Sequence, residues 1–129
     1  METIRRFVEQ LETIWDARIE IEGEVTREPP IPVALAAFQI LQEALVNALK
    51  HSDSETIAVR VGEDAGMLHV AVVDSGRGFA TDQEVGMDHL GMQLMRQRAE
   101  GVGGVIELDS RPGEGTRVEA VLPAAITAA

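Results

Sequence analysis

Hydrophobic positions recur along this chain with two different periods, which divide it into helical and extended segments. Apolar residues return every three or four positions from Glu2 to Asp16, and again from Val33 to His51, a stretch that contains neither proline nor glycine. A third stretch of this kind runs from Leu90 to Glu100 and stops at a glycine-rich segment that begins with Gly101. The pattern therefore predicts three amphipathic helices.

Elsewhere apolar and polar residues alternate at every second position, as they do in strands with one buried face. Short turns join two pairs of consecutive strands, which predicts two hairpins. Because single strands and helices do not alternate regularly, the order favours an α+β fold, a two-layer sandwich, over a doubly wound sheet. The predicted strands are Arg18–Glu22, Ile57–Val61, Leu68–Val72, Val105–Leu108 and Thr116–Leu122.

The length and composition of the chain predict a single soluble domain. The chain has 129 residues, and we expect the domain to span residues 1–124, with the alanine-rich residues 125–129 as a frayed tail. The absence of cysteine excludes disulfides and thiolate metal sites. No uninterrupted apolar run approaches the roughly 18 residues of a membrane span.

Charge narrows the classes of partner. The chain carries 11 basic and 22 acidic residues, a net charge of −11. This excess of negative charge opposes general binding to nucleic acid or to an anionic membrane. We therefore expect no nucleic acid and no direct membrane contact among the partners of this piece, and an anionic ligand would need local positive charge or a bound cation.

The long predicted helix carries a polar stripe beside its apolar one. Gln39, Glu43, Asn47 and Lys50 follow one another at steps of three or four residues, so they lie on one face. Asn in a helix interior costs about 0.7 kcal/mol relative to Ala, so its presence calls for a reason. One interpretation is a solvated face; the other is a site where amide and carboxylate oxygens bind Mg²⁺ and Lys50 faces phosphates.

A second candidate lies at the end of a predicted strand. Asp74 continues the face of Leu68, Val70 and Val72 and is followed by a loop with Gly76 and Gly78. Asp, Ser and Gly form ordinary turns, but the glycines also permit close approach of a flat ligand, whose exocyclic amine Asp74 would bind. Neither a dinucleotide fingerprint nor a Gly-Lys-Ser/Thr phosphate loop occurs.

Thr116 shares a face with the apolar residues of the last predicted strand. This places its hydroxyl beside Asp74 if the two strands are neighbours.

Four segments together resemble a known family. Gln42–His51, Asp74–Phe79, His89–Glu100 and Gly113–Thr116 are similar, in order and spacing, to the four sequence boxes of the histidine-kinase ATPase domain, whose superfamily includes DNA gyrase. The first and third segments resemble sensor kinases of the nitrate/nitrite-sensor type. The resemblance covers nearly the whole chain. It implies a Bergerat-type fold, with a mixed sheet of about five strands covered by three helices on one face.

The resemblance also assigns roles in binding ATP and Mg²⁺. It implies that Asn47 coordinates Mg²⁺ and that Lys50 and His51 face the phosphates. Glu43 takes the position of the general base in gyrase-like relatives, and here it would assist the incoming histidine or order the metal's water.

For the base and the lid, the resemblance implies that Asp74 binds the adenine amine, with Thr116 supporting this contact directly or through water. The residues that would line the base pocket are Gly76 and Gly78. The residues that would form the end of the ATP lid, where backbone amides suit phosphate, are His89, Gly91 and Met92.

The family transfers the γ-phosphoryl of ATP to a histidine on a separate dimerisation domain, from which a response regulator receives it. In these kinases an acidic residue follows the acceptor histidine, whereas Ser52, Val70 and Leu90 follow the three histidines here. None of the three histidines therefore matches the acceptor. The resemblance implies a catalytic domain that works in the cytoplasm, and membrane segments elsewhere in the full-length kinase can anchor it. Two alternatives remain: an anti-sigma-type serine kinase or gyrase-like ATPase, and a non-catalytic ATP-binding regulatory module.

Overall fold

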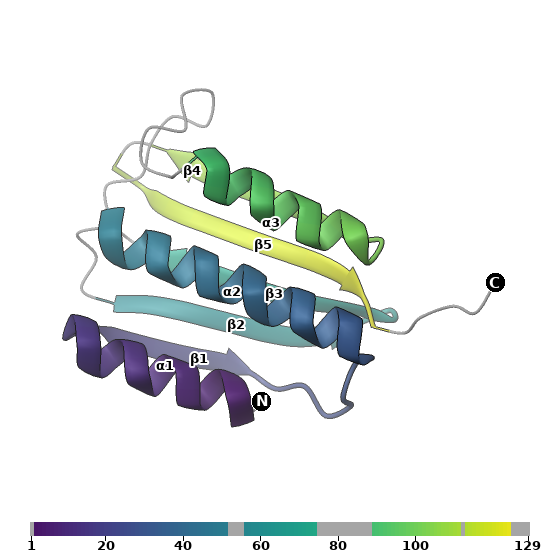
Figure 1. Cartoon of the computed structure of the whole chain (residues 1–129). Helices are drawn as coiled ribbons and strands as arrows, with labels where there is room; N and C mark the ends of the chain where they lie inside the picture. Colours follow the sequence, from purple (N-terminus) through teal and green to yellow (C-terminus); the bar gives the residue numbers. More distant parts are fainter. Residues whose placement is uncertain (1, 52–55, 75–88, 112, 125–129) are drawn as a thin grey trace.

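The described part of the chain forms a five-stranded sheet with three helices on one face, as the sequence predicts. The computed structural model describes residues 2–51, 56–74, 89–111 and 113–124, without the side chains of His51 and His89. The helices lie side by side across the sheet, with α2 between the other two (Figure 1). The elements are α1 (Glu2–Trp15), β1 (Arg18–Gly23), α2 (Ile31–His51), β2 (Thr56–Asp64), β3 (Met67–Asp74), α3 (His89–Gly101), β4 (Val105–Arg111) and β5 (Gly115–Pro123).

The sheet is mixed, and its strands do not follow one another in chain order. The spatial order is β1-β2-β3-β5-β4, in which β1 is parallel to β2 and the other neighbours are antiparallel. Both predicted hairpins, β2 with β3 and β4 with β5, are therefore confirmed. The last strand, β5, lies between β3 and β4 and joins the two hairpins into one sheet.

Helix α2 begins earlier than the sequence suggests. The periodicity predicts a helix from Val33, but α2 starts at Ile31 and takes Pro32 into its first turn. Proline is tolerated there because the first N–H groups of a helix have no partner within it. The amide of Ala34 already donates to the carbonyl of Pro30 at 2.9 Å.

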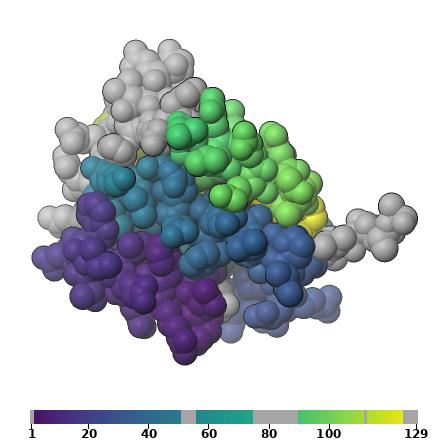
Figure 2. All heavy atoms as spheres, in the orientation of Figure 1, coloured from purple at the N-terminus to yellow at the C-terminus, as the bar shows by residue number. Residues whose placement is uncertain are grey.

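The core lies between the helices and the inner face of the sheet. Leu45 and Val59 are completely buried there, and α1 and α3 contribute residues such as Val8 and Met95. Figure 2 shows the side chains of the three helices closing over most of this face. Burial of this kind stabilises a fold by about 25 cal/mol for each Å² of apolar surface.

Helix α2 is also apolar and long enough, by length and composition alone, to cross a membrane. The span Ile31–Lys50 has a mean hydropathy of 1.4, although Gln39 and Glu43 interrupt its apolar run. Half of its most apolar window is buried inside the fold, and a core helix meets the same criterion. Its hydropathy is therefore accounted for by its place over the centre of the sheet.

Helix α3 ends at the predicted glycines in a left-handed cap. Gly103 has a φ of 83°, and its amide donates to the carbonyl of Glu100 at 3.0 Å. The amide of Gly104 donates to the carbonyl of Ala99 at 2.8 Å, which completes a Schellman motif. Gly104 also lies against Leu122 of β5, where a Cβ atom would find no room. The cap thus fixes how α3 lies over β5.

Candidate functional site

Asp74 and Thr116 lie opposite each other at one end of the sheet, as we expected if their strands were neighbours. Asp74 is the last residue of β3 and pairs in register with Thr116 of β5. Only 7% of Asp74 is exposed, because it continues the inner face of β3. A carboxylate at this depth requires hydrogen-bond donors. The position is therefore suited to a ligand that presents N–H groups.

Ser110 completes this group, although the sequence pattern does not single it out. The pattern predicts a fourth strand that ends at Leu108, but β4 continues to Arg111, so that Ser110 falls on the inner face and pairs with Thr116. The Oγ atoms of the two side chains are 2.9 Å apart. The two-residue alternation of Ile106 and Leu108 already pointed to this position, had the strand been continued by one pair.

A cavity of about 280 Å³ opens at this end of the sheet. Asp74, Ser110 and Thr116 line it from the inner face, while Val73, Asp109 and Arg117 reach it from the outer face, so the cavity extends around the strand ends. Its volume is close to the lower limit for small-molecule sites, about 300 Å³.

A larger cavity of about 380 Å³ lies elsewhere, under α1 and the first half of α2. Its walls are mostly apolar side chains such as Val25, Phe38 and Val70. It lacks the converging polar groups that distinguish a binding site for a nucleotide. We therefore place the candidate site at the Asp74 end.

The polar stripe on α2 is not solvated along its whole length, because Asn47 is only 4% exposed. Its Nδ2 atom has no hydrogen-bond partner among the residues that the structure describes. A buried polar group without a partner costs about 1–3 kcal/mol. Further along the stripe, Gln39 accepts a hydrogen bond from Arg98 of α3 at 2.8 Å, while Lys50 is exposed.

Gly91 brings the start of α3 against this stripe. A Cβ atom at Gly91 would collide with Oε1 of Glu43 and would lie 3.4 Å from Nδ2 of Asn47. Only glycine allows the two helices to approach so closely without displacing a side chain. Glu43, Asn47 and Gly91, three of the expected site residues, are therefore in one place.

Two more expected residues, Met92 and His89, belong to α3. Met92 is 2% exposed and packs in the core, so its side chain contributes to the fold, and only its backbone can face a ligand. His89 supplies the first residue of α3. Outside the described residues lie Gly76, Gly78 and the side chains of His51 and His89.

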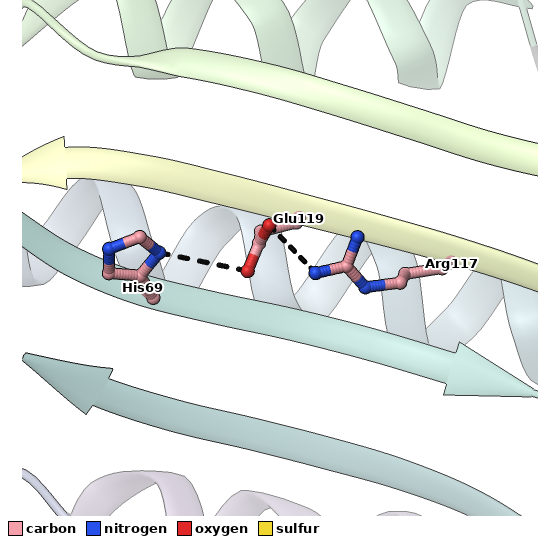
Figure 3. Close-up of polar contacts among 3 residues, drawn as sticks. All are labelled: His69, Arg117 and Glu119. Atoms are coloured by element: carbon pink, nitrogen blue, oxygen red, sulfur yellow. Dashed lines mark hydrogen bonds and ion pairs between the residues drawn. The ribbon is translucent and has the colours of Figure 1, made fainter.

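The open face of the sheet carries a separate polar group. Figure 3 shows His69, Glu119 and Arg117 on the side of the sheet away from the helices. Arg117 donates to Glu119 at 2.8 Å, and Nδ1 of His69 lies 3.7 Å from the same carboxylate. His69 lies on the face opposite to Asp74, so it is not part of the candidate site.

The approach of α3 to α2 can be tested with a matched pair of glycines on α3. We expect Gly91→Ala to lower the free energy of unfolding by about 1 kcal/mol, the lower end of the cost of overpacking, because the flexible Glu43 carboxylate can move aside. Gly101→Ala meets no atom within 4 Å and should raise it by about 0.5–1 kcal/mol, because Ala is the better helix former. Urea unfolding measures both. If the two variants are equally stable, the helices are further apart than described.

Most of this chain is similar to known protein sequences. Residues 33–126 match the family described as histidine kinase-, DNA gyrase B-, and HSP90-like ATPase. Over 86 residues the chain is 40% identical to the sensor histidine kinase LiaS of Bacillus subtilis (strain 168) and 34% identical to the sensor protein VraS of Staphylococcus haemolyticus. Each alignment covers 67% of this chain and 24% of the relative. The chain thus spans about a quarter of the length of these relatives.

Comparison with solved structures leads to the same family. The histidine kinase domain of a blue-light activated histidine kinase from Erythrobacter litoralis superposes with a TM-score of 0.79 at 26% identity, covering 92% of this chain and 62% of that one. The family match alone includes most of the chain, from α2 to the end of β5. The chain therefore belongs to the histidine kinase-, DNA gyrase B-, and HSP90-like ATPase family, as a catalytic ATP-binding domain of the sensor histidine kinase type.

Proposed function

We propose that this domain binds ATP together with Mg²⁺ and donates the γ-phosphoryl group to a histidine on a separate dimerisation domain of the same kinase. The observation that carries the proposal is the grouping of Glu43, Asn47 and Gly91 on two helices, at the end of the sandwich where β3 ends with Asp74 (Figure 1). Acceptors for a base and polar groups for a metal and phosphates thus occur together.

The buried pair at the sheet end would hold the base. Asp74 would accept a hydrogen bond from the exocyclic amine of adenine, and Thr116 would support that contact. Their direct pairing across β3 and β5 supports this assignment, because both side chains face the inner layer at the same level. In the same scheme Gly76 and Gly78 would line the pocket.

The buried amide of Asn47 fits a magnesium ligand. Exchange of Oδ1 and Nδ2 by rotation of the amide would present an oxygen where an atom without a partner now lies. In the described ranges no three His, Cys, Asp or Glu side chains gather as a closed metal site. Mg²⁺ suits such a place, because it keeps several waters and takes other ligands from phosphates. When bound, it would neutralise charge on the phosphates during transfer.

Phosphate groups would lie between α2 and the start of α3. Helix α3 begins at His89, and a helix N-terminus favours anions. The exposed Lys50 and the neighbouring His51 would add positive charge. Glu43, which lies against Gly91, would assist the incoming histidine or order water on the metal.

The rest of the kinase is inferred from the relatives. Their greater length leaves room for an acceptor domain, and we propose this domain and a response regulator as partners. We also propose that residues 1–124 form the domain, that it works in the cytoplasm within a kinase that can be membrane-anchored, and that the kinase is of the nitrate/nitrite-sensor type.

Phosphoryl transfer itself can be tested with a purified acceptor-histidine module. Mixing it with this domain, Mg²⁺ and radiolabelled ATP should label the module with phosphate that is lost in acid and stable in base. Phosphate stable in acid would instead indicate a serine kinase. Tight ATP binding without any transfer would indicate a regulatory module.

The base assignment predicts that Asp74→Asn weakens ADP binding by about 1–3 kcal/mol, because a charge-assisted hydrogen bond in a buried site is lost. Calorimetry measures the affinity. Asp109→Asn is the matched control, since Asp109 lines the same cavity from the outer face of β4 and should bind as the wild type does. Equal affinities of the Asp74 variant and the wild type would contradict the base pocket.

The metal assignment predicts opposite effects of Asn47→Ala on stability and binding. Without nucleotide, the free energy of unfolding should stay at or above that of the wild type, because an unpartnered buried amide is removed and Ala favours the helix. With nucleotide, calorimetry should show that Mg²⁺ no longer strengthens ADP binding. Gln42→Ala removes an exposed amide from the same helix and should keep the magnesium effect. A retained effect in the Asn47 variant would exclude it as a ligand.

A further inference from the structure

Ser110 is a buried polar residue for which the proposed function has no role. It is 4% exposed, and the other buried polar side chains in the described part of the chain, Asn47 and Asp74, both belong to the proposed site. A buried hydroxyl costs free energy unless it makes hydrogen bonds, and a small apolar residue would avoid that cost. The hydrogen bonds of the Ser110 hydroxyl therefore indicate its role.

Two hydrogen-bond contacts involve the Ser110 hydroxyl. Its Oγ donates to the carbonyl oxygen of Gly115 at 3.2 Å and lies 2.9 Å from Oγ1 of Thr116, where either hydroxyl can be the donor. A hydroxyl carries one proton, so a Ser110 hydroxyl that donates to Gly115 can only accept from Thr116. In that arrangement the Thr116 proton is directed at Ser110. The lone pairs of Thr116 Oγ1 remain for the cavity that both residues line.

The direction of the hydrogen bond from Thr116 to Ser110 affects which purine base the cavity can bind. Opposite Thr116 lies Asp74, whose carboxylate accepts hydrogen bonds when it is ionised. Two acceptors side by side match a 6-amino group, which has two N–H donors. They oppose a 6-oxo group, whose oxygen would face other lone pairs, and a site built around hydrogen bonds discriminates strongly against a ligand that leaves them unmade.

We propose that Ser110 is a positioning residue that holds the Thr116 hydroxyl as an acceptor, and that it thereby makes the base pocket select 6-amino over 6-oxo purines. The inference rests on the proposed nucleotide function and adds to it a third residue, which touches the base only through Thr116. A purely structural role is the alternative, because the bond to Gly115 also closes the turn of the β4–β5 hairpin.

The test compares ADP with inosine diphosphate, which carries a 6-oxo group, by calorimetry on the full chain at saturating Mg²⁺. In Ser110→Ala the Thr116 proton is free to turn and donate to the oxo group. The preference for ADP should therefore fall by about three- to ten-fold, the range of one neutral hydrogen bond. Ser110→Thr keeps the hydroxyl and should keep the preference. Thr13→Val, which removes an exposed hydroxyl bonded to the Glu9 carbonyl, is the control and should change nothing.

Thr116→Val provides a second route if Ser110→Ala does not fold. It removes the hydroxyl that would contact the base and should lower the preference for ADP by the same factor. In the double variant, Ser110→Ala with Thr116→Val, this preference should fall no further. Equal weakening of both nucleotides in Ser110→Ala, or an unchanged preference in Thr116→Val, would overturn the inference.

The outcomes separate this inference from the proposed function. If the wild type binds neither nucleotide, both are wrong. If ADP binds, and Asp74→Asn weakens it while the Ser110 and Thr116 variants keep the preference, only the role of Ser110 is wrong.

Discussion

The packing of α2 on the centre of the sheet is the interaction on which the rest of the structure depends. The helix buries one side against the inner faces of the strands and holds α1 and α3 beside it (Figure 1). Leu45 at its middle is completely buried. The same rigid helix carries Glu43 and Asn47. The groups proposed for the metal and for catalysis are therefore held by the part of the molecule that contributes most to its core, a placement that preorganises them.

The site retains features that disfavour folding. Asn47 has a buried nitrogen without a partner in the described residues, and Asp74 is a carboxylate buried at the end of a strand. Burying polar groups of this kind costs free energy that a small apolar residue would avoid. Both have a purpose if a metal–nucleotide complex binds at this end of the sandwich. Their coincidence at one end of the fold is the physical argument for function.

Much of the fold follows from periodicity, and the exceptions have identifiable causes. Alternation in β3 and β5 was enough to predict that Asp74 and Thr116 share a face, and the register confirms it. Ser110 was missed because Asp109 and Arg111 made the end of β4 look like a loop. No local sequence pattern predicts that β5 lies between β3 and β4, because this position depends on pairing between distant strands. The burial of Asn47 likewise comes from α3 lying over it, which the helix sequence alone does not reveal.

The place of β5 has a consequence for how the protein is made. Asp74 and Thr116 come from hairpins that are far apart in the chain, and they meet only when the last strand inserts between two earlier ones. During synthesis on the ribosome, an incomplete chain has the helix that carries Asn47 but lacks Thr116, which pairs with Asp74 across β3 and β5. The proposed adenine pocket is thus among the last parts of the domain to be assembled, and a half-made chain would lack it.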